Sequence, residues 1–461
     1  MKKLLITLAT IFALTTLLAS CDFISTTPPA NNGGSTDNNG STENDGNIND
    51  GGNTNPGDYE TSYSEGLDFV SNGDGTCYVS GIGSCSGSAS YVQFNLIIPS
   101  TSPDGDAVIG IGERAFEDCN MLMSVVIPEG VTYIESDAFF NCYNIESITI
   151  PNSLSSIGYN ALACISLTEI TVGENNKNYK AVDNVLYTKD GKTLIKYAAG
   201  KADTEFTVPN DVTTIYDYAF SCCHNLISVV IPNSVTRIAD FAFDSSGGLT
   251  SIVIPESVTY LGSYAFNWCD KLASVVIPES ITSIEAWTFV NCDSLTSVEI
   301  HKSVTKIDTA AFGYCDKLTE ITVDENNEFY KSIDGNLYTK DGKTLVQYAT
   351  GKADTKFVIP DGVIHVGYYA LQLCNNLTSV VIPDSATDIV AYAFENCENL
   401  NSVVIGKNVK NIEWGAFQNC EKLANVYYAG SAEEWAQITI EDHYNDALLN
   451  ATIHYNYVPE N

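Results

Sequence analysis

The stretch SVTYLGSYAFNWCDKLASVVIPE, residues 257–279, decides the fold, because close variants of it recur along the chain. Its proline belongs to a series spaced by 23 residues, and the clearest run is Pro209, Pro232, Pro255 and Pro278. The shared pattern is V-x-x-I-x-x-x-A-F-x-x-C-x-x-L-x-x-V-x-I-P. A fixed period of this length is typical of stacked repeats, in which each unit buries its apolar face only against its neighbours. The sequence therefore predicts a solenoid.

Each repeat is expected to contain a β-strand at its L-x-x-V-x-I segment. Successive side chains of a strand point to opposite faces, so Val275 and Ile277 would be buried while Ser274 and Val276 face outward. We count about 14 such segments, from residues 96–98 to 426–428, which predicts a mainly β repeat solenoid of about 14 stacked turns.

Two insertions break the period, and they are near-copies of each other, because residues 179–192 recur as 330–343. In the first copy Asp190-Gly191 lies between apolar runs, a pattern typical of tight hairpin turns where glycine accepts a positive φ. We therefore expect two inserted hairpins that project from the solenoid.

The composition narrows the classes of function. The chain has 461 residues, with 57 acidic and 22 basic side chains and a net charge of −35. Nucleic acid is excluded as a partner, because phosphate binding needs a basic face. Five histidines leave little material for His-based catalysis or metal sites. The motifs G-x-S-x-G, H-E-x-x-H and G-x-x-x-x-G-K-S/T do not occur, so we predict no enzyme, no metal and no cofactor.

The N-terminus resembles a bacterial lipoprotein signal peptide over residues 1–20. A positive start is followed by an apolar run too short to span a membrane, and the sequence Leu-Ala-Ser precedes Cys21. The resemblance implies that Cys21 carries acyl chains and anchors the protein to a membrane. The alternative is an ordinary signal peptide with a chance cysteine. Residues 21–58 are rich in Asn and Gly and predict a flexible tether.

The repeat pattern resembles the BspA-like, or treponemal-type, leucine-rich repeat family. The resemblance covers residues 105–430 and implies a right-handed leucine-rich-repeat array. Residues 59–104 resemble the N-terminal cap of that family. The segment VYYAGSAEEW at residues 426–435 leads into residues 431–461, which resemble its C-terminal cap. It further implies a surface-exposed bacterial protein, since some relatives are adhesins for host matrix proteins or act in cell–cell aggregation.

Most cysteines occupy one slot of the repeat. Because Ser246, Gly200 and Gly351 fill the same slot elsewhere, we expect small, buried, unpaired thiols rather than disulfides. Cys77 and Cys85 lie outside the array, and they are the best candidates for a disulfide. The ten cysteines in the slot are Cys119, Cys142, Cys164, Cys223, Cys269, Cys292, Cys315, Cys374, Cys397 and Cys420.

Two rows of residues are expected to face outward. The residue before Ala-Phe is aromatic in four consecutive repeats, namely Tyr218, Phe241, Tyr264 and Trp287. These side chains would stack into a strip that either binds a ligand or stabilises the solenoid. The second row is the outward strand position, which is rich in β-branched residues such as Val230, Val253, Val276 and Val404. That row suits a pleated surface for structural reasons alone, yet solenoids commonly bind partners on this face.

We therefore predict a lipid-anchored protein of the bacterial cell surface that binds host or neighbouring-cell proteins or glycans outside the cell, with Tyr218, Phe241, Tyr264 and Trp287 as the ligand-binding hypothesis. The membrane would be contacted through the lipid anchor only. One alternative is a structural surface protein that acts by self-association. The other is glycan capture for nutrient uptake, with the aromatic strip as the sugar platform.

Overall fold

The computed structural model describes residues 64–86 and 93–458. The chain divides into residues 1–60 and 61–461, and every described residue belongs to the second part. The predicted signal peptide, Cys21 and the tether lie outside the described residues, and the limits of the predicted segments stay predictions. Among the residues described, no helix combines the length and apolar character that a membrane crossing requires.

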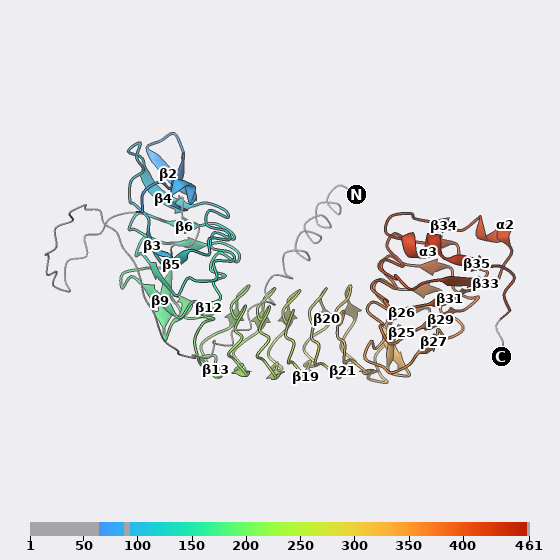
Figure 1. The fold of residues 1–461 in the computed structure, drawn as a ribbon. Helices are drawn as coiled ribbons and strands as arrows, with labels where there is room; N and C mark the ends of the chain where they lie inside the picture. Colours follow the sequence, from blue (N-terminus) through green and yellow to red (C-terminus); the bar gives the residue numbers. More distant parts are fainter. Residues whose placement is uncertain (1–63, 87–92, 459–461) are drawn as a thin grey trace, which may run out of the picture. The chain divides into compact units, whose positions relative to one another are not determined.

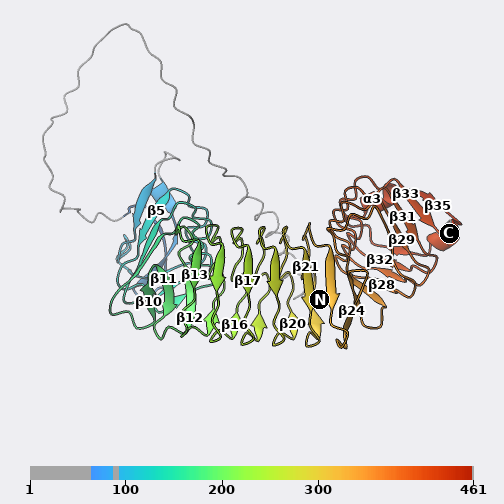
Figure 2. The ribbon, with the colours of Figure 1, turned by 90° about the horizontal axis from the view of Figure 1, so that it is seen from below.

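The described chain is a mainly β solenoid of about 15 turns of roughly 23 residues, as the repeat predicted (Figure 1). A regular turn contains a longer strand and a short strand, and equivalent strands of successive turns pair in parallel. In the central turns Ser251 pairs with Ser274 and Val253 with Val276, an offset of 23 residues. In Figure 2 the longer strands β13, β17 and β21 lie on one side of the turns, and the short strands β16 and β20 lie on the other.

The longer strands form four sheets. The first contains β3 (Phe94–Ile97), β5 (Leu122–Val126), β7 (Ser147–Ile150) and β9 (Glu169–Val172). The second contains β13 (Glu205–Thr207), β15 (Ser228–Val230), β17 (Ser251–Val253) and β19 (Ser274–Val276). The third contains β21 (Ser297–Ile300) and β23 (Glu320–Val323). The fourth contains β27 (Lys356–Val358), β29 (Ser379–Ile382), β31 (Ser402–Ile405), β33 (Asn425–Tyr428) and β35 (Thr452–His454).

The short strands and the hairpins form the other four sheets. The first contains β1 (Asp68–Ser71), β2 (Thr76–Gly81), β4 (Ala107–Ile111), β6 (Tyr133–Ile134) and β8 (Ser156–Ile157). The second contains β10 (Tyr179–Val182), β11 (Val185–Thr188), β12 (Thr193–Tyr197), β14 (Thr214–Ile215), β16 (Arg237–Ile238) and β18 (Tyr260–Leu261). The third contains β20 (Ser283–Ile284) and β22 (Lys306–Ile307). The fourth contains β24 (Tyr330–Ile333), β25 (Asn336–Thr339), β26 (Thr344–Gln347), β28 (His365–Val366), β30 (Asp388–Ile389), β32 (Asn411–Ile412) and β34 (Thr439–Ile440).

Helical structure is confined to short pieces within the described residues. They are the 3₁₀ helix η2 (Gly83–Ser86) and the α-helices α2 (Ala432–Trp435) and α3 (Asp446–Asn450). Ser431 caps α2 with a capping box, because its hydroxyl accepts from the Glu434 amide while the Glu434 carboxylate accepts from the Ser431 amide. Both α-helices lie near the C-terminal end of the array, where the last turn would otherwise expose its apolar face.

Phenylalanine side chains form a continuous stack inside the central turns. Phe220, Phe243, Phe266, Phe289 and Phe312 are fully buried, and neighbouring rings are nearly parallel with centroids 4.9, 5.1, 5.4 and 5.7 Å apart. Each stacked aromatic pair contributes about 0.5–1.5 kcal/mol beyond burial alone. The period therefore stabilises the fold, because it places identical rings above one another.

The repeated cysteines are buried free thiols, as predicted. Their role is more specific than that of a small apolar filler, because most of these thiols contact a carbonyl of the preceding turn, namely Cys142, Cys164, Cys269, Cys292, Cys315, Cys397 and Cys420. The Cys292 thiol donates to the Phe266 carbonyl at 3.2 Å, and the Cys269 thiol donates to the Phe243 carbonyl at 3.3 Å. Ser246 replaces cysteine in one turn, and its hydroxyl donates to the Phe220 carbonyl at 2.6 Å. In these regular turns the slot therefore holds a small side chain that donates a hydrogen bond.

The two hairpins exist, but the prediction that they project from the solenoid is wrong. In the first copy β10, β11 and β12 pair antiparallel, and β12 then pairs in parallel with β14. The second copy repeats this order with β24, β25, β26 and β28. The hairpins extend the short-strand sheets because β12 and β26 bury alternate residues and take the place of a regular short strand.

The structure does not support the predicted disulfide between Cys77 and Cys85. Cys77 is a buried free thiol, and its sulfur donates to the Asp106 carbonyl at 3.6 Å. Its strand β2 pairs with both β1 and β4, which holds the Cys77 side chain in the core. The side chain of Cys85 lies outside the described residues.

Candidate functional site

The four predicted aromatic residues stack on one another. The centroid distances are 4.8 Å for Tyr218–Phe241, 4.6 Å for Phe241–Tyr264 and 6.0 Å for Tyr264–Trp287, with interplanar angles of 11°, 5° and 10°. Trp287 then meets Tyr369 edge-on at 5.0 Å. The stack is longer than predicted, and we call the whole set the aromatic ladder: Tyr159, Tyr218, Phe241, Tyr264, Trp287, Tyr369, Tyr392, Trp414 and Tyr444.

The ladder is built on an unusual backbone conformation. Tyr218, Phe241, Tyr264 and Trp287 have φ angles of 55°, 57°, 57° and 61°, in the left-handed region that bulky residues rarely adopt. This conformation costs a residue with a side chain roughly 1–2 kcal/mol. Gly415 takes the same slot in a later turn at a φ of 61°. The aromatic residues persist there because stacking with two neighbours offsets the backbone strain.

Stacking leaves the inner rings with covered faces. Each of Phe241 and Tyr264 has a nearly parallel ring on both sides, so only ring edges remain for solvent. Burial raises the pKa of Tyr264 to about 12. A sugar needs a free ring face for packing, so this arrangement supports the stabilising interpretation of these residues over the ligand-binding one.

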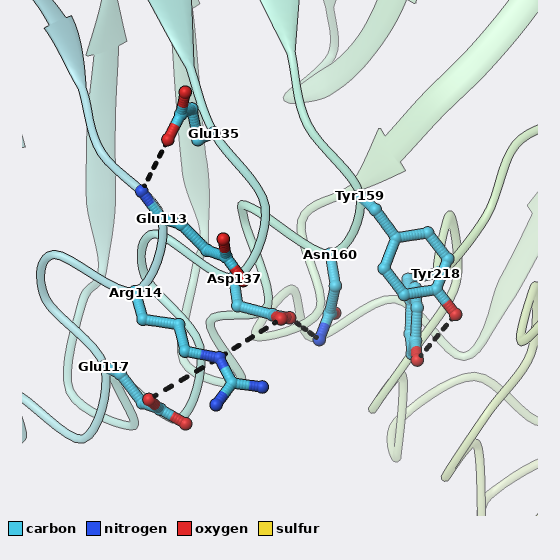
Figure 3. Close-up of polar contacts among 8 residues, drawn as sticks. All are labelled: Glu113, Arg114, Glu117, Glu135, Asp137, Tyr159, Asn160 and Tyr218. Carbon is cyan, nitrogen blue, oxygen red and sulfur yellow. Dashed lines mark hydrogen bonds and ion pairs between the residues drawn. The ribbon is translucent and has the colours of Figure 1, made fainter. Parts of the chain in front are cut away.

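A polar row continues the same surface toward the N-terminus (Figure 3). The Arg114 Nε lies 3.7 Å from Asp137, and the amide of Asn160 donates to the Asp137 carboxylate at 3.0 Å. Tyr159 links this row to the ladder, because its hydroxyl donates to the Tyr218 hydroxyl at 3.1 Å and its ring lies edge-on to that of Tyr218. Arg114, Asp137 and Asn160 share the left-handed slot, with φ of 56°, 56° and 54°.

The outward strand position forms a separate, apolar row. Val230, Val253 and Val276 on β15, β17 and β19 are 56%, 69% and 60% exposed, as their alternation predicted. The exposed Glu299 occupies the next position of this row on β21. On β13 the row continues with Thr207, the register partner of Val230, and the exposed Glu205 lies two residues earlier on that strand.

The prediction that Val404 faces outward is wrong. Val404 is only 8% exposed, and its register partner on the next strand is Tyr427. The Tyr427 ring packs against Tyr457 at 4.7 Å, and the Tyr457 amide donates to the Tyr428 carbonyl at 3.0 Å. The segment that follows β35 therefore returns along the strand face and covers it at the C-terminal end, which the repeat pattern could not indicate.

Two buried carboxyls escaped the sequence analysis because they occupy a variable position of the repeat. Asp244 is 5% exposed and accepts from the Asn267 amide at 2.6 Å. Glu395 lies 151 residues later, and it accepts from the Tyr314 hydroxyl at 3.1 Å and from the Gln372 amide. Burial raises the pKa of both groups, that of Asp244 to about 6. The one sequence signal that could have identified these carboxyls is their recurrence at the spacing of 151 residues that separates the two copies of the duplicated segment.

The fold resembles solved structures of bacterial leucine-rich repeat proteins. A leucine-rich cell surface protein of Faecalibacterium prausnitzii A2-165 is 27% identical, and the match covers 83% of this chain and 98% of that one with a TM-score of 0.42. A leucine-rich repeat protein of Bacteroides ovatus is 22% identical, with coverage of 86% and 100% and a TM-score of 0.37. The pneumococcal vaccine antigen PcpA is 17% identical, with coverage of 85% and 97% and a TM-score of 0.39.

No curated protein sequence matches the chain. The family model of the BspA type leucine-rich repeat region matches in 6 copies over residues 96–185, 199–319 and 349–453, which is more than half of the chain. This agrees with the repeat read from the sequence and with the stacked turns of the structure. The chain belongs to the BspA type leucine-rich repeat family.

Proposed function

We propose that the chain is a lipid-anchored protein of the bacterial cell surface that binds an extracellular protein through its exposed strand face. The observation that carries the proposal is the row of Val230, Val253 and Val276, each more than half exposed on adjacent strands. Contiguous exposed apolar side chains mark interaction surfaces in proteins that are otherwise polar outside. Leucine-rich repeat proteins generally bind protein partners, which supports a protein as the ligand.

The chemistry of the face indicates what kind of protein surface fits. β-branched side chains lose little rotamer freedom on binding, so the valine row is already ordered for contact. A partner with an apolar centre and a basic rim is favoured by Glu299 at one end of the row, by the exposed Glu205 on strand β13 and by the net charge of −35. Association should therefore be faster at low salt than at high salt.

The proposal leaves the aromatic ladder with a stabilising role. The hypothesis that Tyr218, Phe241, Tyr264 and Trp287 bind the ligand stays a prediction, but their covered ring faces weigh against it. Nothing in the proposal requires catalysis.

Binding of the full chain to immobilised fibronectin, laminin and collagen would be measured by surface plasmon resonance. In the variants Val253→Lys and Val276→Lys a charge replaces the centre of the face, and we expect affinity for the bound protein to fall at least about tenfold. Val358→Lys is the matched control, because Val358 is 56% exposed on the separate sheet of β27. Equal binding by parent and strand-face variants would refute the assignment of the face.

A further inference from the structure

A cleft opens where the first hairpin joins the solenoid. The hairpin strands β10, β11 and β12 come between β8 and β14, and residues of all these strands line a cleft of about 370 Å³. Binding sites for small molecules generally occupy about 300–1,000 Å³, so the cleft is at the small end and suits one sugar ring. Its lining includes Tyr179, Thr193, Thr214, Tyr216, Asp217 and Arg237.

Two opposite charges line this cleft without forming an ion pair in the described part of the chain. Asp217 accepts one hydrogen bond, from the Asp240 amide to Oδ1 at 3.1 Å. The Arg237 guanidinium lies 3.8 Å from the centre of the Tyr260 ring, a cation–π contact that fixes its plane. A carboxylate only accepts and a guanidinium only donates hydrogen bonds, so together they match adjacent hydroxyl groups, which do both.

The cleft also offers the half-buried ring of Tyr216, which is not consumed by stacking. Tyr216 belongs to no ring pair among the described residues, in contrast to the tyrosines of the aromatic ladder. Tyr179 is only 8% exposed and packs in the core beneath the cleft. The Tyr179 hydroxyl donates to the Ser155 carbonyl at 3.3 Å, which ties the hairpin to the preceding turn. Aromatic rings combine a large apolar body with a polar end, which suits a ligand with both C–H and hydroxyl surfaces.

A buried polar atom beside the cleft lacks a partner. Asn160 is 8% exposed and donates to Asp137, but its Oδ1 has no hydrogen bond within the described structure (Figure 3). It lines a cavity of about 20 Å³ that shares Tyr216 and Asp217 with the cleft. A buried acceptor without a partner costs about 1–3 kcal/mol. A space of this size holds one water molecule, which a ligand hydroxyl can replace.

The cleft chemistry is not imposed by the fold. At the positions 151 residues later, His365, Tyr368 and Asp388 replace Thr214, Asp217 and Arg237. The His365 Nδ1 lies 2.9 Å from the Asp388 carboxylate, so these two groups of the second copy contact each other. At the first hairpin Asp217 and Arg237 therefore do not pair with each other, whereas the corresponding region of the second copy holds a contacting pair.

From this combination we infer that the cleft at the first hairpin binds a neutral sugar, with Asp217 and Arg237 contacting neighbouring hydroxyl groups. Asp217 and Arg237 carry opposite charges, and the net charge of −35 disfavours an anionic sugar. The site is separate from the valine row of the proposed protein interface.

Saturation-transfer NMR on the purified full chain would test the site with D-glucose, D-galactose, D-mannose and N-acetyl-D-glucosamine, each at about 10 mM because single-site sugar binding is weak. We expect at least one of these sugars to bind with a millimolar dissociation constant. Asp217→Asn keeps an oxygen for the Asp240 amide and Arg237→Met keeps the aliphatic stem, and each should weaken binding about tenfold or more.

Lys306→Met is the matched control, because Lys306 occupies the Arg237 position of a later turn on β22. The Lys306→Met variant should bind the sugar as the parent does. The strand-face variant Val253→Lys should also bind it normally, so a failure of the proposed protein interface can be distinguished from a failure of the sugar site. Absence of binding by all four sugars would overturn the inference. Equal binding by Asp217→Asn, or binding of glycine or glucuronate in place of the neutral sugars, would do so as well.

Discussion

The same position of successive repeats holds different residues, because the adjacent turns determine which side chain fits and what it can contact. The thiol slot accepts Cys292 or Ser246, since both donate to a carbonyl one turn earlier. Gly200 and Gly351 occupy it at the hairpins, where an added Cβ would lie 2.4 Å from backbone atoms of the preceding turn. Burial raises the pKa of the Cys292 thiol well above its ordinary value, so these cysteines should be inert toward oxidants while folded.

Asp244 should make the stability of the fold depend on pH. Burial raises the pKa of its carboxyl from 3.8 to about 6, so the native state keeps a proton that the unfolded chain has already released. The resulting stabilisation is present below about pH 4 and is lost as pH rises through about 6. The difference amounts to about 3 kcal/mol, which Asp244→Asn should abolish.

Urea unfolding at pH 4.5 and pH 7 spans about 2 of these 3 kcal/mol, because the unfolded carboxyl is already mostly ionised at pH 4.5. The contribution is the difference between parent and variant, which removes the effect of the other carboxyls. The Asn267 amide that donates to Asp244 can also donate to an asparagine oxygen, so the variant should fold. A pH dependence that is the same in both proteins would contradict the assignment.

At the scale of the element, the aromatic ladder combines a strained left-handed backbone with stabilising ring stacking. Substitutions of Tyr264 distinguish these two contributions to the free energy of unfolding. In Tyr264→Ala both ring contacts are lost and the left-handed φ of 57° is kept. Tyr264→Gly loses the same contacts but removes the steric cost of the backbone. We expect both variants to be less stable than the parent, with glycine about 1 kcal/mol more stable than alanine.

Chemical denaturation of the three proteins would compare their free energies of unfolding. Ser274→Ala against Ser274→Gly is the control pair, because Ser274 lies in strand β19 and not at a left-handed corner. There alanine should be the more stable variant. An alanine variant at Tyr264 that equals or exceeds the glycine variant would show that the corner carries no strain.

The elements differ in how far the sequence predicts them. The strand pattern predicts Val253 outward and Val275 inward because alternation is local. It does not predict the residues with left-handed φ angles, because these positions hold aromatic side chains and not the glycine that usually adopts this conformation. It also misses the burial of Val404 and the cleft at Asp217, because both depend on segments that meet only in the folded chain. Stacking of Tyr218 to Trp287 was predictable from the period, whereas its covered ring faces were not.

At the scale of the molecule, the solenoid has no single centre, because its buried residues form three clusters arranged along the chain. Each turn contacts only its neighbours, so stability is nearly a sum of turns and of the interfaces between them. The two hairpins separate sheets that otherwise share one period. Deletion of a whole repeat should therefore leave a folded protein, whereas deletion of part of a repeat should disrupt the fold.

Deletion of residues 257–279 tests this additivity, because it removes one full period of 23 residues and joins Glu256 to Ser280, which follows the same Pro-Glu pair. The new neighbours keep the register, so Phe241 should stack on Trp287 and Phe243 on Phe289. We expect a folded protein with an unchanged circular dichroism spectrum per residue and a slightly smaller denaturant m-value, in proportion to the lost surface. Deletion of residues 257–268 alone would leave a partial turn that shifts every later strand out of register, and it should cost far more stability. Equal stability of the two deletions would show that the period of 23 residues does not control the stacking.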